Sequence, residues 1–159
     1  MSFRVGIGVD AHALQGGGIP LVLGGVHIEY PRGLAGHSDG DVITHALIDA
    51  LLGAAGLGDI GTLFPSGDDR YKGSNSLDLL REAYRQVREA GWKLVNADCV
   101  LVGEQPKIAA HRDEMRRVLS KELAAEVNVR ATTTDKLGFT GRGEGLAAHA
   151  VALLESAAL

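Results

Sequence analysis

The feature that most constrains the fold is the order in which strand-like and helix-like segments alternate along the 159-residue chain. Alternating or β-branched runs predict strands at residues 3–9, 92–102 and 127–133, and a hairpin or bulge at 21–28 around Gly24 and Gly25. Apolar residues at helical spacing, with capping residues and glycines at the ends, predict helices at 38–52, 75–90, 106–123 and 144–157. Ser38 or Asp39 is the expected cap of the first helix.

This order of segments predicts an α+β fold in which helices cover a mixed β-sheet. The length suits one domain, and we expect residues 1–159 to form it. Hydrophobic residues make up 45% of the chain but aromatic residues only 4%, so the core must consist mainly of Ala, Val, Leu and Ile.

Charge and composition also limit the possible partners and compartments. The formal net charge is −4 and there is no basic tract, so we expect no nucleic-acid partner. No apolar run reaches the roughly 18 residues of a membrane-spanning helix, and no signal segment precedes the first strand. These features predict a cytoplasmic protein. The single Cys99 lies in a strand-like run and is expected to be a buried thiol rather than a nucleophile.

Three residues suggest a metal site. Asp10 and His12 are two positions apart, so on an extended strand their side chains point to the same side. His45 follows on the first predicted helix. One carboxylate and two imidazoles suit a four-coordinate Zn²⁺ with one open position, and Mn²⁺ or Co²⁺ would also fit. Asp41 and Asp49 share the helix face of His45, so either could accept its second ring proton.

Blocks along nearly the whole chain resemble the 2-C-methyl-D-erythritol 2,4-cyclodiphosphate synthases of the non-mevalonate isoprenoid pathway. These blocks are 8–12 (GVDAH), 37–41 (HSDGD), 58–61 (GDIG), 64–65 (FP), 71–73 (YKG), 131–134 (ATTT) and 136–145 (KLGFTGRGEG).

The resemblance implies a phosphorus–oxygen lyase that converts 4-diphosphocytidyl-2-C-methyl-D-erythritol 2-phosphate to the 2,4-cyclodiphosphate and CMP. It further implies a homotrimer with active sites between subunits. By position, the metal ligands are Asp10, His12 and His45, and the transition-state contacts are His37 and Thr133. A second divalent ion, Mg²⁺ or Mn²⁺, is expected with the substrate diphosphate near Asp135. The other substrate contacts implied are Ser38, Asp59, Ile60, Gly61, Phe64, Lys107, Thr132, Thr134, Phe139 and Arg142, and Asp10, His12 and Asp135 also touch substrate.

Two positions depart from the family pattern. Asp135 stands where the family usually has Glu, and Ser66 stands where it usually has Asp. The shorter Asp135 side chain could shift the second metal or bind it through water.

Two other functions fit parts of the pattern. A phosphoester hydrolase would use a metal-bound hydroxide and often a nearby general base. A non-catalytic trimer could instead bind isoprenoid diphosphates as a sensor. The segment 58–71 is the candidate lid over the site, and an ordinary surface loop is the alternative.

Overall fold

Five strands form a mixed sheet in the order β4–β1–β7–β5–β6 in the computed structural model, which describes residues 1–157. Neighbouring strands are antiparallel except β5 and β6, which are parallel and joined by a helix. The sheet strands are β1 (Phe3–Gln15), β4 (Gly33–Leu34), β5 (Trp92–Val102), β6 (Glu126–Thr132) and β7 (Gly145–Ser156). The chain therefore has the α+β fold with a mixed sheet that the sequence predicts.

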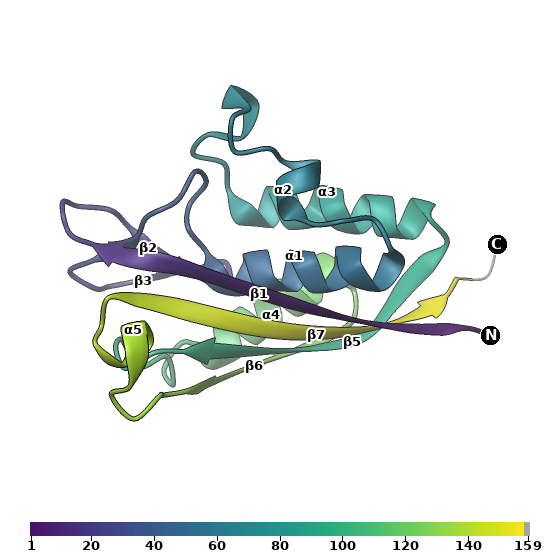
Figure 1. Cartoon of the computed structure of the whole chain (residues 1–159). Helices are drawn as coiled ribbons and strands as arrows, with labels where there is room; N and C mark the ends of the chain where they lie inside the picture. Colours follow the sequence, from purple (N-terminus) through teal and green to yellow (C-terminus); the bar gives the residue numbers. More distant parts are fainter. Residues whose placement is uncertain (158–159) are drawn as a thin grey trace.

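Helices α1 (Val42–Ala55), α3 (Ser76–Glu89) and α4 (Arg112–Leu123) cover one face of this sheet (Figure 1). Helix α1 packs directly on β1 and β7, α3 packs on α1, and α4 packs on β6. Three short elements complete the fold: α2 (Ile60–Leu63), the 3₁₀ helix η1 (Asp69–Tyr71) and α5 (Gly138–Gly141). Among residues 1–157, no helix is long and apolar enough to cross a membrane.

Helix α1 lies very close to β1 because the strand carries glycine where the two meet. A Cβ atom on Gly8 would lie 1.8 Å from the carbonyl oxygen of Ala46, and one on Gly6 would lie 2.1 Å from that of Ala50. Glycines on the strand and alanines on the helix thus let the two backbones come into direct contact. This close approach places His45 of α1 beside the side chains of β1.

Asp41 fixes the start of α1 and anchors a separate hairpin to it. The hairpin consists of β2 (Leu21–Leu23) and β3 (Val26–Ile28), and its turn residues Gly24 and Gly25 both have positive φ. The buried Asp41 carboxylate accepts hydrogen bonds from both glycine N–H groups, each at 2.8 Å, and from the N–H and hydroxyl of Thr44. The predicted hairpin is confirmed, but the helix cap is Asp41 rather than Ser38 or Asp39.

One prediction of element type is wrong. Residues 145–156 form the strand β7 between β1 and β5, not the helix predicted for 144–157. Every second residue of β7 is buried under the helices, namely Leu146, Ala148, Ala150, Ala152 and Leu154.

Three predicted boundaries also shift. The first strand continues to Gln15 instead of ending near Val9, α1 begins at Val42 instead of Ser38, and α4 begins at Arg112 instead of Pro106. The buried thiol predicted for Cys99 is confirmed, and burial raises its pKa to about 12.

Candidate metal centre and substrate cavity

Asp10, His12 and His45 converge as the spacing predicts. Along β1 the side chains of Asp10 and His12 lie on the side that faces α1, the same side on which Gly6 and Gly8 leave room for the helix backbone. His45 comes from the second turn of α1, opposite them. The Asp10 Oδ2 atom lies 2.8 Å from His12 Nε2 and 3.1 Å from His45 Nδ1, and the two histidine nitrogens are 3.4 Å apart.

These separations suit a single divalent cation. Metal–ligand bonds of about 2.0–2.2 Å in tetrahedral geometry place ligand atoms about 3.3–3.6 Å apart. The three atoms lie slightly closer than this on average, so a cation requires only small outward movements. Two imidazole nitrogens and one carboxylate oxygen are a donor set typical of a catalytic Zn²⁺ site that keeps one position open.

The charges at this cluster are strongly coupled. Burial alone would raise the pKa of Asp10, but hydrogen bonds to His12 and His45 outweigh it and lower this pKa to about 2. Burial disfavours a charged His45, yet the hydrogen bond to Asp10 and the Asp10 charge raise the pKa of His45 above its usual value. The cluster thus favours positive charge at the point where a cation would sit.

The second ring nitrogen of His45 contacts two hydroxyl groups. His45 Nε2 lies 2.9 Å from Ser38 Oγ and 2.8 Å from Ser76 Oγ. The prediction that Asp41 or Asp49 accepts this ring proton is wrong. Asp41 is fully used as the helix cap, and Asp49 accepts a hydrogen bond from the backbone N–H of Ile60 at 2.7 Å.

A cavity of about 390 Å³ opens beside the metal ligands. It brings together eight of the residues that sequence reasoning assigned to the site: Asp10, His12, His37, Ser38, His45, Ile60, Gly61 and Phe64. Asp59 does not line it but caps the short helix α2, accepting from the N–H and hydroxyl of Thr62. Asp59 thereby orients the Ile60–Gly61 part of the wall.

The candidate lid forms the outer wall of this cavity, which Phe64, Pro65, Ser66, Gly67 and Tyr71 line. The lid is joined to the metal side at His37. The ring Nε2 of His37 lies 3.2 Å from the carbonyl oxygen of Asp68, and the His37 carbonyl accepts from the N–H of Gly73 at 2.7 Å. Because a carbonyl only accepts, Nε2 carries the proton, which leaves Nδ1 as the other polar atom of the ring.

Five more of the predicted residues line other cavities. Lys107, Thr132 and Thr133 line a second cavity of about 150 Å³ at the ends of β5 and β6. Lys107 and Arg142 also line a third, and Phe139 lines a fourth beside His12. The first and second cavities share no lining residue, so the chain does not bring His37 and Thr133 into one cavity.

Thr134 and Asp135 lie in the turn after β6. The hydroxyl of Thr134 contacts that of Thr140 at 2.8 Å, and Asp135 has a positive φ of 52° beside Thr133.

Comparison with known proteins places this geometry in a family. The model of the YgbB family matches residues 3–155. The chain belongs to the YgbB family. Proteins named 2-C-methyl-D-erythritol 2,4-cyclodiphosphate synthase from Erwinia tasmaniensis and Geobacillus kaustophilus are 56% and 54% identical to it. The alignments cover 95% and 96% of this chain and 98% of each relative. The family predicted from the sequence blocks is therefore confirmed.

Solved structures of similar proteins share the fold. A structure of 2C-methyl-D-erythritol-2,4-cyclodiphosphate synthase in a CDP-bound form aligns with a TM-score of 0.87 and 42% identity over 96% of this chain and all of that one. The bifunctional IspDF from Campylobacter jejuni aligns with a TM-score of 0.93 and 44% identity over 98% of this chain. The match spans 42% of that longer protein.

Two residues of this YgbB chain escaped the sequence reasoning about the site. Ser76 is fully buried and touches His45, and Asp39 accepts hydrogen bonds from the Ser76 hydroxyl and backbone N–H. Asp39 lies in the block HSDGD, which carried part of the family resemblance. The residue itself was predicted only as a possible cap of the first helix. Ser76 follows Asn75, the cap of α3, and carries no pattern of its own.

Proposed function

We propose that this chain catalyses the metal-dependent ring closure of 4-diphosphocytidyl-2-C-methyl-D-erythritol 2-phosphate to 2-C-methyl-D-erythritol 2,4-cyclodiphosphate, with release of CMP. This is an intramolecular phosphoryl transfer, formally a phosphorus–oxygen lyase reaction. A single domain over residues 1–159 and a cytoplasmic location remain predictions.

The observation that carries the proposal is the convergence of Asp10, His12 and His45 on the wall of a cavity large enough for part of a nucleotide sugar. The names of the relatives point to the same product, and one solved relative is described with CDP bound. A cation on the wall of such a cavity is the feature that a diphosphate requires.

The reaction needs charge neutralisation more than proton transfer. An oxygen of the 2-phosphate forms a bond to the β-phosphorus. The bond from the β-phosphorus to the oxygen shared with the α-phosphate breaks, and CMP leaves with that oxygen and the bonding electrons. The attacking oxygen is already an anion at neutral pH, so no general base is assigned. A bound Zn²⁺, or Mn²⁺ or Co²⁺, supplies Lewis acidity that draws charge from the phosphate oxygens.

The chain's own residues orient the phosphates and exclude water. Thr133 donates a hydrogen bond to a phosphate oxygen as charge moves during the transfer, and such a donor is worth ~2.7–4 kcal/mol. His37 donates to the phosphates in the same way through Nδ1 when its ring carries protons on both nitrogens, because Nε2–H is already bonded to the Asp68 carbonyl. Ser38 and Gly61 hold the sugar, and Asp59, predicted as a third contact, orients the Ile60–Gly61 wall by capping α2. The lid keeps water from the β-phosphorus, because hydrolysis there would give a linear product.

Other groups bind the nucleotide end. Lys107, Thr132 and Thr134 face the cytidine and its α-phosphate, and Asp135 holds a second divalent ion, Mg²⁺ or Mn²⁺, through one carboxylate. Asp135 lies beside Thr133 at the end of β6, which supports one shared phosphate site for the two residues.

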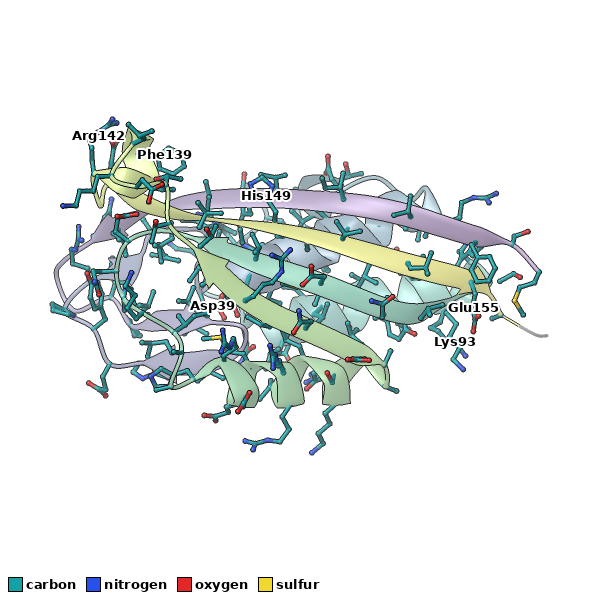
Figure 2. All side chains as sticks on the ribbon, turned by 90° about the horizontal axis from the view of Figure 1, so that it is seen from below. Asp39, Lys93, Phe139, Arg142, His149 and Glu155 are labelled. Atoms are coloured by element: carbon teal, nitrogen blue, oxygen red, sulfur yellow. The ribbon has the colours of Figure 1, made fainter. Side chains whose placement is uncertain are left out.

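We further propose a homotrimer in which the first cavity of one subunit faces the second cavity of its neighbour. The separation of His37 from Thr133 within one chain supports this, since one substrate must contact both. The sheet face opposite the helices supports it too, because large apolar side chains stand exposed there (Figure 2). They are Phe3, Val5, Ile7 and Val9 on β1 and Val151 on β7, which are 44–69% exposed.

Product analysis with the cytidyl substrate tests the reaction. We expect cyclic product and CMP in equal amounts, loss of both with a chelator, and recovery on adding Zn²⁺ and Mg²⁺. His45→Ala should lose bound Zn²⁺ and turnover while keeping its fold by circular dichroism. Linear phosphate products would instead support the hydrolase, and binding without turnover the sensor. Full activity in metal-free buffer would refute metal dependence.

The oligomer mass tests the assembly. Ile7→Asp places a charge on a side chain that is 67% exposed in the single chain, so the subunit should still fold. In a trimer the same charge is buried, and we expect dissociation and lost turnover. Gly16→Asp is the control, since it adds the same charge in an open exposed turn. A monomeric wild-type protein with full activity would overturn the proposed trimer.

A further inference from the structure

We propose that Ser76 and Asp39 form a hydrogen-bonded relay that positions His45 for the metal, and that Ser38, although equally close to His45, is not part of it. This inference rests on the proposed metal site at Asp10, His12 and His45. It assigns a positioning role to two residues that do not touch the substrate cavity: neither Ser76 nor Asp39 lines it.

The proton positions on His45 follow from its geometry. Its Nδ1 atom faces the other two ligands, at 3.1 Å from Asp10 Oδ2 and 3.4 Å from His12 Nε2. A neutral imidazole that binds a cation through Nδ1 must carry its proton on Nε2. The Nε2–H group then needs an acceptor, and Ser76 Oγ lies 2.8 Å away in a fully buried position.

The Ser76 hydroxyl in turn has one acceptor to which it can donate its own proton, the carboxylate of Asp39. Its oxygen accepts from His45, so its O–H donates to Asp39 Oδ1, with which it makes a short contact. The other carboxylate oxygen of Asp39 accepts from the backbone N–H of Ser76 at 2.9 Å. Asp39 therefore accepts two hydrogen bonds from Ser76. Its negative charge makes the Ser76 hydroxyl a stronger acceptor for the N–H of His45.

The carboxylate itself is held in place. Asp39 Oδ1 also accepts from the backbone N–H of Asp41 at 3.0 Å, and the N–H of Asp39 donates to the carbonyl of Ser74 at 3.1 Å. These bonds tie the segment before α1 to the segment before α3. The order of contacts is thus metal site, His45, Ser76, Asp39, with each donor meeting one acceptor.

Ser38 differs from Ser76 because its hydroxyl has no carboxylate partner among the described residues. Its Oγ atom lies 2.9 Å from His45 Nε2, and Ser38 lines the cavity. Since His45 Nε2 carries a proton, Ser38 cannot donate to it. The Ser38 O–H is thereby free to donate into the cavity, toward a substrate oxygen.

Metal titration separates the two hydroxyls. Groups that hold a ligand histidine typically contribute about 10–100-fold to metal affinity. We expect Ser76→Ala and Asp39→Asn each to weaken Zn²⁺ binding by about 10–100-fold, measured by competition with a chromophoric chelator. Ser38→Ala should change this affinity by less than about 3-fold, whatever its effect on turnover, because it removes no charged acceptor. With Co²⁺ in place of Zn²⁺, the visible absorption bands should change in the relay variants and stay as in wild type for Ser38→Ala.

Controls distinguish positioning from loss of fold. Asp78→Asn removes a carboxylate from the exposed first turn of the same helix and should leave metal affinity unchanged. Thermal unfolding of each metal-free variant reports structural damage separately from the affinity of the folded protein. Affinities within 2-fold of wild type in both relay variants, or an equal loss in Ser38→Ala, would overturn the relay. If wild type itself binds no metal, the proposed function fails first, and the two failures are distinct.

Discussion

The contact between Gly8 and α1 gives a direct test of how the fold builds the metal centre. In Gly8→Ala the new Cβ would lie 1.8 Å from the Ala46 carbonyl oxygen, whereas ordinary contacts begin at 3.4 Å. The helix and strand backbones must therefore separate by about 1.6 Å locally or distort, and neither atom belongs to a flexible side chain. Overpacking of this kind costs about 1–3 kcal/mol, and a backbone clash belongs at the upper end.

The separation also acts on the ligands. Asp10 and His12 follow Gly8 on β1, whereas His45 precedes Ala46 on α1, so the clash moves the two halves of the site apart. Metal sites tolerate deviations of only about 0.2 Å in ligand distances. We expect Gly8→Ala to lower the unfolding temperature by about 6–12 °C, as ~3 kcal/mol implies for a chain of this size, and to purify with little bound metal.

Differential scanning calorimetry and metal analysis of the purified protein check both effects. Gly53→Ala is the matched control. It lies in α1, its Cβ would stay 3.8 Å from the nearest atom, Ile7 O, and alanine favours a helix by about 1 kcal/mol over glycine. It should unfold at the same or a higher temperature and keep its metal. Gly8→Ala with wild-type metal content and an unchanged unfolding temperature would refute the reasoning.

Four further outcomes follow from single side chains. Asp41→Ala removes the acceptor of four hydrogen bonds and should lower the unfolding free energy by ~3 kcal/mol in urea titrations; an unchanged unfolding midpoint would contradict its anchoring role. Cys99, with a pKa of about 12, stays protonated at pH 8 and should react with a chromogenic disulfide only after unfolding; fast reaction in the native protein would contradict this. Because the pKa of metal-free His45 is raised above 6.5, protons compete with the cation already near neutral pH. Zn²⁺ affinity should therefore fall from pH 8 to pH 6, and a flat profile would count against the assignment. Asp135→Ala should weaken the Mg²⁺ dependence of turnover more than the Zn²⁺ content, and equal loss of both metals would argue for one shared site.

The elements that were predicted correctly from the sequence have clear local patterns, such as capping residues and glycines at their ends. The strand Trp92–Val102 matches its predicted bounds, and α3 lies within one residue of its predicted ends, where Asn75 caps it and Gly91 follows it. The metal ligands were found for a similar reason. A D-x-H spacing on an extended strand puts both side chains on the same side, and in the fold that side faces α1.

The strand β7 was missed because both of its faces are apolar. Between the residues that face the helices stand Ala147, His149, Val151 and Leu153, three of which are apolar and one of which, Ala147, is also buried, so the period of two that marks a half-buried strand is hidden. The alanines then favoured a helix by propensity. In the fold, however, Ala148 and Ala150 lie beneath α1, where small side chains let the helix approach the sheet, so packing overrides propensity. Ser76 and Asp39 were missed for another reason: they lie 37 residues apart in sequence, and the fold brings the loop before α1 against the first residue of α3.

The alternation of side chains along a strand also links the metal centre to the proposed assembly. On β1, one side carries Gly6, Gly8, Asp10 and His12 toward α1, and the other carries Phe3, Val5, Ile7 and Val9 away from the helices. A shift of register by one residue would exchange these two sets completely. β1 pairs with β7 over eleven residues, from Phe3 with Glu155 to Ala13 with Gly145. This register therefore fixes which residues of β1 face α1 and which face away from the helices. A neighbouring subunit that packs on the outer side of β1 would thus stand at a fixed distance from the metal ligands on its inner side. That constraint is what an active site divided between subunits requires, because Thr133 and Lys107 of one chain would then have to reach the phosphates of a substrate bound at the cation of another chain.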